Sequence, residues 1–135
     1  MEQINVLLVD DEDEFVKSLS ERMKMRDLEP GIALNGVQAL KIVDEEIPDV
    51  MVLDLKMPGI DGLEVLRQVK KNYPQLLVIM LTGHGSEKVE EEARRLGAFE
   101  YLEKPTEMDK LVETIKKAYK HKQKIEGIAR TDTSV

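Results

Sequence analysis

The sequence predicts a doubly wound α/β sandwich around a five-stranded parallel sheet, and three observations support this fold class. Five apolar runs of strand length alternate with longer stretches that have helical spacing. The strongest runs are apolar at nearly every position, which is typical of inner strands covered by helices on both faces. The length of 135 residues is that of one domain, and no internal repeat is visible.

The five expected strands differ in strength. Near-continuous apolar runs predict inner strands at residues 4–9, 50–55 and 76–81, and a shorter run predicts a strand at residues 99–102. The weakest strand, at residues 32–34, follows Pro30 and Gly31. Because proline has no N–H to donate to a neighbouring strand, we expect this strand at an edge of the sheet.

The five expected helices follow these runs. The first has apolar residues at i, i+4 over residues 15–23. Side chains that can cap a helix precede the other four: Asn35, Asp61, Ser86 and Thr106. Glu64 and Asp109, three residues after two of these caps, suggest variants of the capping box. Gly97 stands where a C′ glycine would end the fourth helix.

The helical period fades near the C-terminus, after about residue 123. We therefore expect one domain over residues 1–123. Residues 124–135 are expected to form a flexible tail or the start of a linker.

Composition argues against several functional classes. The chain has no cysteine, which excludes thiol nucleophiles, thiolate zinc sites, iron–sulfur clusters and disulfides. The net charge of −7 and the absence of tryptophan argue against direct nucleic-acid binding. No apolar run is long enough to span a bilayer, and the N-terminus lacks the basic region of a signal peptide. We expect a cytoplasmic protein without membrane insertion.

Residues that follow the strands are the candidates for chemistry, because doubly wound sheets bind ligands outside the carboxyl ends of their strands. Carboxylates, a hydroxyl and an ammonium group should gather there: Asp10, Asp11, Asp54, Thr82 and Lys104. A buried Asp54 would be costly unless it is paired or coordinates a cation. A cluster of oxygen ligands suits Mg²⁺, and the Asp54 carboxylate could then form an acyl phosphate.

Two of these residues have ordinary roles as alternatives. Lys104 could pair with Asp54 and later with a phosphoryl oxygen, although most lysines are simply solvated. Thr82 could donate a hydrogen bond to the same phosphoryl group, although threonine is common in strands. Pro105 follows Lys104, and the sequence leaves the isomer of that bond open.

Four segments together carry a resemblance to a known family. They are Asp10-Asp11, DLKMPGIDG (54–62), LTGHGS (81–86) and EYLEKP (100–105). In this combination they resemble the receiver domain of two-component response regulators, over about residues 3–123. The resemblance implies a flavodoxin-like sheet of order 2-1-3-4-5. It also implies a phosphorylation-activated signalling switch that assists its own phosphorylation and dephosphorylation rather than an enzyme.

The resemblance assigns roles at the acidic end. Asp54 would be the phosphoacceptor. Mg²⁺ would be bound directly by Asp11, by Asp54 and by the backbone carbonyl of Lys56, and through water by Asp10.

It assigns further roles to residues around that site. Thr82 and Lys104 would hold the phosphoryl group, and Tyr101 matches the aromatic switch position that responds to Thr82. Tyr101 is otherwise an ordinary half-buried strand aromatic. His84 and Lys56 would border the path of the attacking water and so tune the lifetime of the phosphoryl group.

Partners are also implied by the resemblance. The phosphodonor would be a sensor histidine kinase or a phosphotransfer protein. The fourth helix, fifth strand and fifth helix would control a downstream output domain or effector protein, and could mediate a phosphorylation-dependent homodimer. Whether the chain is a stand-alone receiver or the first domain of a longer regulator stays open.

Two other functional classes are alternatives to this one. A Mg²⁺-dependent phosphohydrolase could use Asp54 as its nucleophile, but DLKMP lacks the second aspartate of the D-x-D-x-T pattern. A flavodoxin-like FMN binder would need a phosphate loop after the first strand, where this chain has DDEDE. Neither a GxGxxG nor a Walker A pattern is present.

Overall fold

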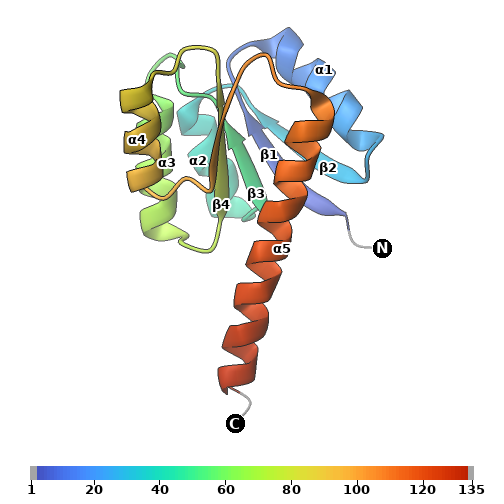
Figure 1. Ribbon diagram of the computed structural model, residues 1–135. Helices are drawn as coiled ribbons and strands as arrows, with labels where there is room; N and C mark the ends of the chain where they lie inside the picture. Colours follow the sequence, from blue (N-terminus) through green and yellow to red (C-terminus); the bar gives the residue numbers. More distant parts are fainter. Residues whose placement is uncertain (1–2, 134–135) are drawn as a thin grey trace.

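A parallel sheet with strand order β2-β1-β3-β4-β5 forms the centre of the computed structural model, which describes residues 3–133 (Figure 1). The strands within this range are β1 (Ile4–Val9), β2 (Leu28–Ala33), β3 (Val50–Leu53), β4 (Leu77–Thr82) and β5 (Glu100–Glu103). All neighbouring strands pair in parallel. The predicted doubly wound fold and its strand order are confirmed.

Helices cover both faces of the sheet, in strict alternation with the strands. They are α1 (Asp13–Lys24), α2 (Gly36–Glu45), α3 (Gly62–Asn72), α4 (Glu87–Arg95) and α5 (Met108–Thr133). One apolar cluster joins α1 and α5 to one face, and a second joins α2, α3 and α4 to the other (Figure 1). Because both faces are covered, β3 and β4 are buried at every position.

Strand β2 lies at the edge of the sheet, as Pro30 predicts, but it is longer than expected. Pro30 and Gly31 lie inside the strand rather than before it, and Pro30 faces Val6 of β1. An edge strand has only one neighbour to bond, so a residue without an N–H is tolerated within it.

Three of the predicted caps are confirmed. The side chains of Asn35, Asp61 and Ser86 accept hydrogen bonds from the backbone N–H three residues further on. The Glu64 side chain pairs with Arg67, so the capping box suggested there is not closed. Gly97, at φ 104°, ends α4 in the left-handed conformation, as predicted.

One expectation for the last helix is wrong, and the helix is longer than its periodicity indicates. Helix α5 starts at Met108, with the Leu111 N–H donating to Glu107 O, so Thr106 is not its cap. The helix also continues through Thr133, beyond residue 123 where the helical period fades (Figure 1). The domain boundary at residue 123 stays a prediction. Residues 120–127 (KHKQKIEG) lack an apolar stripe, yet most of them favour helix, and a helix whose contacts are polar needs no such stripe. Residues 134–135 lie outside the described residues.

An ion pair holds α5 against the amino-terminal edge of the sheet. Lys122 Nζ lies 2.8 Å from Asp49 Oδ1, and the Asn5 N–H donates to Asp49 Oδ2 at 2.9 Å. Both charged side chains are largely buried, at 15% and 21% exposure. In the part of the chain that the structure describes, no helix combines the length and apolar character of a membrane span.

Candidate functional site

Two carboxylates lie buried where β1 and β3 end. Asp10 follows β1 directly, and Asp54 follows β3, which ends two residues earlier than expected. The Asp54 N–H donates to Val9 O at 2.9 Å, so the end of β3 is fixed beside the end of β1. Asp10 is 5% exposed and Asp54 is 3% exposed. The sheet order therefore brings together two carboxylates that are far apart in the sequence.

Lys104, which follows β5, reaches into this acidic pair. Its Nζ lies 2.6 Å from Asp10 Oδ2, 3.1 Å from Glu12 Oε1 and 3.9 Å from Asp54 Oδ2. The Phe15 ring lies below the ammonium group, 4.3 Å from Nζ to the ring centroid, and favours the cation there. The Lys104–Pro105 peptide bond, left open by the sequence, is cis.

The ionisation of these groups reflects burial first. Burial raises the pKa of the Asp54 carboxyl, and the Asp10 carboxylate raises it further, while Lys104, the Leu55 N–H and the Thr82 hydroxyl act in the opposite direction. Burial alone would lower the pKa of Lys104, but its bond to Asp10 and the other carboxylates raise it overall. The lysine therefore stays charged. Its single positive charge does not balance the negative charges of the carboxylates around it.

The carboxylates close enough to share a cation include two of the expected residues, Asp10 and Asp54, and one that was not expected, Glu12. Oxygens of Asp10, Glu12 and Asp54 all lie within 4.8 Å of one another. Asp11 is exposed, but it lines a hollow of about 330 Å³ together with Glu12, Asp54, Lys56, Met57, Pro58 and His84. Every charged ligand offered is a carboxylate oxygen, which suits Mg²⁺. The direct roles of Asp11 and of the Lys56 carbonyl stay predictions.

Glu12 was missed in the sequence. It stands in the acidic run DDEDE, where no spacing rule distinguishes one carboxylate from the next. In the structure, the Glu12 N–H donates to Asp10 Oδ1 at 2.9 Å and closes a local turn. This turn directs the Glu12 side chain toward Lys104.

Thr82 ends β4 and is fully buried. Its Oγ1 accepts a hydrogen bond from the His84 N–H at 3.1 Å, and its hydroxyl also interacts with Asp54. The His84 and Lys56 side chains are exposed at the rim of the hollow. These positions match the expectations, while the roles in holding and releasing a phosphoryl group stay predictions.

Tyr101 lies on β5 and is buried, with 6% of its surface exposed. Its hydroxyl makes no hydrogen bond of normal geometry with the described residues, although the Ser86 N–H lies toward it. Burial raises the pKa of the phenol, more than the carboxylates of Glu103 and Glu90 do. The ring is thus in an inward, buried position.

The loop from β3 to α3 packs tightly against the backbone of Asp54. The Gly62 N–H donates to Leu55 O at 2.7 Å. A Cβ at Gly62 would overlap Asp54 O and lie 2.8 Å from Leu55 Cα. Only glycine allows α3 to begin this close, so Gly62 helps to fix the backbone of Asp54 in place.

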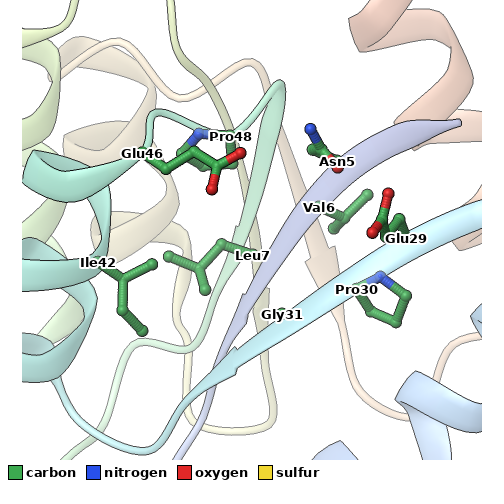
Figure 2. Close-up of a pocket in the computed structure, with 9 residues that line it drawn as sticks. All are labelled: Asn5, Val6, Leu7, Glu29, Pro30, Gly31, Ile42, Glu46 and Pro48. Atoms are coloured by element: carbon green, nitrogen blue, oxygen red, sulfur yellow. The ribbon is translucent and has the colours of Figure 1, made fainter. Parts of the chain in front are cut away.

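A second hollow, of about 210 Å³, lies at the opposite end of the strands, between β1, β2 and α2 (Figure 2). It is lined by Asn5, Val6, Leu7, Glu29, Pro30, Gly31, Ile42, Glu46 and Pro48. None of the predicted site residues borders it. The candidate site is therefore the acidic hollow at the carboxyl ends of the strands.

The order 2-1-3-4-5, with acidic residues after β1 and β3 and a lysine after β5, defines the class of flavodoxin-like receivers. Comparison with known proteins then gives the family. The family model described as response regulator receiver domain matches residues 6–116, and the chain belongs to this family.

Several curated proteins are similar in sequence. An NtrX-like response regulator of Rickettsia felis is 40% identical over 120 residues, which cover 87% of this chain and 25% of that protein. The sporulation initiation phosphotransferase F of Bacillus subtilis is 36% identical over 112 residues, covering 83% of this chain and 90% of that protein. The chain thus spans about a quarter of the length of its NtrX-like relatives.

Solved structures have the same fold. A CheY-like receiver domain protein of Methanospirillum hungatei matches with a TM-score of 0.88 at 27% identity, covering 91% of this chain and 98% of that one. NtrX of Brucella abortus matches with a TM-score of 0.89 at 27% identity, covering 96% of this chain and 30% of that one. Response regulators work with histidine kinases and carry or control output domains, so the chain is a signalling domain by family.

Proposed function

We propose that the chain is a phosphorylation-dependent switch that accepts a phosphoryl group on Asp54 from a phosphohistidine. The observation that carries this is the buried Asp54 carboxylate, 3.9 Å from Lys104 Nζ and beside the Thr82 hydroxyl. An Asp54 oxygen bonds to phosphorus as the P–N bond of the phosphohistidine breaks. The electron pair of that bond stays on the imidazole nitrogen, which becomes neutral histidine after proton uptake.

The neighbouring residues would stabilise the transferred group. Phosphoryl transfer depends on positioning and on neutralising charge spread over the phosphoryl oxygens. Lys104 supplies one positive charge, after shifting from Asp10 and Glu12 toward the phosphoryl group. Thr82 supplies a hydroxyl donor from the end of the adjacent strand. Gly62 keeps the Asp54 backbone fixed while this happens.

Mg²⁺ fits the site, because three carboxylate oxygens meet there with a single lysine to offset them. We propose that Asp11 and Asp54, the Lys56 carbonyl and, through water, Asp10 hold the ion. When bound, it neutralises charge on the carboxylates and on phosphoryl oxygens. Glu12 is an added candidate from the geometry.

The remaining assignments are proposals of the same kind. Thr82 moves toward the phosphoryl group, Tyr101 responds, and the surface of α4, β5 and α5 controls a downstream domain or effector or forms a homodimer. His84 and Lys56 tune the phosphoryl lifetime from the rim of the hollow. We place this activity in the cytoplasm, without direct nucleic-acid contact.

The test is the intact mass after incubation with a small acyl phosphate, with Mg²⁺ or with EDTA. We expect one added phosphoryl group that requires Mg²⁺ and is absent in Asp54→Ala. Asp44→Asn is the matched control, because Asp44 pairs with Tyr73 on the contact between α2 and α3 and should leave the adduct intact. No adduct with intact donor contradicts the proposal, and no adduct with rapid donor turnover supports the phosphohydrolase instead.

A further inference from the structure

The Tyr101 ring occupies a slot that exists only because residue 85 is glycine. A Cβ built on Gly85 would overlap the Tyr101 hydroxyl oxygen and lie 2.8 Å from Tyr101 Cζ. It would also lie 3.2 Å from Thr82 Cγ2, so the Thr82 methyl group forms another wall of the same slot. Real Cβ atoms do not approach ring carbons this closely. Any side chain at position 85 must therefore displace the ring.

The backbone at this position gives no other reason for glycine. Within the described residues, glycines with positive φ are Gly59 and Gly97, and Gly85 is not among them. An alanine can adopt the backbone conformation of Gly85, so the obstacle is Tyr101 itself. The neighbouring Gly83 has room instead, since its Cβ would make an ordinary contact 3.7 Å from Lys104 Cβ.

A second place for the ring lies outside the slot. A hollow of about 490 Å³ borders Tyr101 and is lined also by Glu90, Glu103 and Lys110. There the hydroxyl would meet water and charged groups, whereas in the slot it is buried without a normal hydrogen-bond partner. Burial of the ring favours the inward position, and the unsatisfied hydroxyl opposes it. The two positions therefore compete.

We propose that Gly85 is the positioning residue that admits Tyr101 to its buried position and so sets the resting balance of the switch. The regulatory meaning rests on the proposed phosphoacceptor function. The steric relation between Gly85 and Tyr101 does not, and it is tested without phosphorylation.

Nitration by tetranitromethane measures the exposure of Tyr101 directly. The chain has three tyrosines and no cysteine to compete for the reagent, and peptide mass spectrometry separates the three sites. In Gly85→Ala, we expect Tyr101 to be nitrated roughly tenfold faster, because the outward state changes from a minor to the main population. Tyr73 and Tyr119 serve as internal references. Gly83→Ala is the matched control and should leave the Tyr101 rate unchanged.

Melting temperatures give an independent measure. Gly85→Ala should lower the melting temperature in the wild-type background and have little effect in Tyr101→Ala, where the slot is empty. This cycle also covers the case in which the single variant does not fold, since Gly85→Ala/Tyr101→Ala is then expected to fold as Tyr101→Ala does. Tyr101→Phe should be neutral or stabilising, because it removes the unsatisfied hydroxyl.

An unchanged Tyr101 nitration rate in folded Gly85→Ala overturns the proposal. So does an equal increase in Gly83→Ala, which would indicate a loosened loop, or a loss of stability that persists without Tyr101. Failure of the phosphoacceptor function would appear separately, as no Asp54 adduct in the wild type, and would leave the nitration result unaffected.

Discussion

The Asp54 carboxylate is buried beside Asp10, and among the described residues Lys104 is the one cation paired with these two negative charges. Its raised pKa has a definite consequence for stability. Above the ordinary carboxyl pKa of about 4, the folded state holds this proton more tightly than the unfolded chain. The free energy of unfolding therefore falls as pH rises from there through the raised pKa, and the full penalty is present above it.

Asp54→Asn should stabilise the metal-free protein at pH 7 by about 1 kcal/mol, because the amide keeps an acceptor for the Leu55 N–H without the buried charge. Thermal unfolding in EDTA at pH 7 measures the gain, and the same measurement at pH 3 should show much less of it. The exposed Asp44→Asn is the control at both pH values. A gain independent of pH would contradict the electrostatic explanation.

Mg²⁺ should relieve the same repulsion by mass action. At about ten times its dissociation constant, it should stabilise the wild type by about 1.4 kcal/mol, measured as a rise in melting temperature against an equal concentration of Na⁺. Asp54→Asn and Asp11→Asn should both reduce the effect. If Asp11→Asn keeps the full effect and Glu12→Gln loses it, the metal ligands are those of the cluster Asp10, Glu12 and Asp54 rather than those implied by the resemblance.

At the scale of single elements, helix α5 depends on one partly buried ion pair near its midpoint. Asp49→Asn should cost about 1 kcal/mol and speed hydrogen exchange in the half of α5 that contains Lys122, because Lys122 loses its close charged partner and keeps only the longer pair with Glu126 at 3.9 Å. Glu113→Gln is the matched control on the same helix, since the Lys117–Glu113 pair is about two-thirds exposed. Equal exchange in the two variants would mean that the pair does not hold the helix.

The elements themselves were largely predictable from the sequence, for identifiable reasons. Caps such as Asn35 and Asp61 act within one turn, so local sequence defines them. The extent of β2 was not predictable, because pairing with β1 overrides the poor strand propensity of Pro30 and Gly31. The length of α5 was missed because periodicity reports what a helix packs against and not whether the helix continues.

The candidate site was predictable in part. Topology brings Asp10, Asp54, Thr82 and Lys104 together, and a sheet of this order does so for any sequence that forms it. The contribution of Glu12 depends on a side-chain rotamer, and the slot at Gly85 depends on a contact with Tyr101 across two elements. Neither has a signature in local sequence.

At the scale of the whole molecule, two apolar clusters on opposite faces of the sheet supply the stability, and among the side chains that the structure describes, up to residue 127, neither includes one beyond Tyr119. Truncation after Gln123 should therefore leave a folded domain, with a melting temperature lower by less than about 5 °C. Circular dichroism and thermal unfolding test this. Loss of cooperative unfolding would refute the predicted domain boundary at residue 123, while truncation after Lys120, which removes Lys122, is the comparison expected to lose more.

The Lys122–Asp49 pair divides α5 into unequal arms. At about 1.5 Å per residue, the arm from Met108 to Lys122 is roughly 21 Å long and the arm from Lys122 to Thr133 roughly 16 Å. If α5 pivots as a rigid rod at this pair, a displacement of its first residues appears at its far end in the opposite direction and at about four-fifths of the size. The helix would then transmit motion from the carboxyl ends of the strands past their amino ends. The position of Lys122 along α5 would determine the ratio of the displacements at the two ends of the helix.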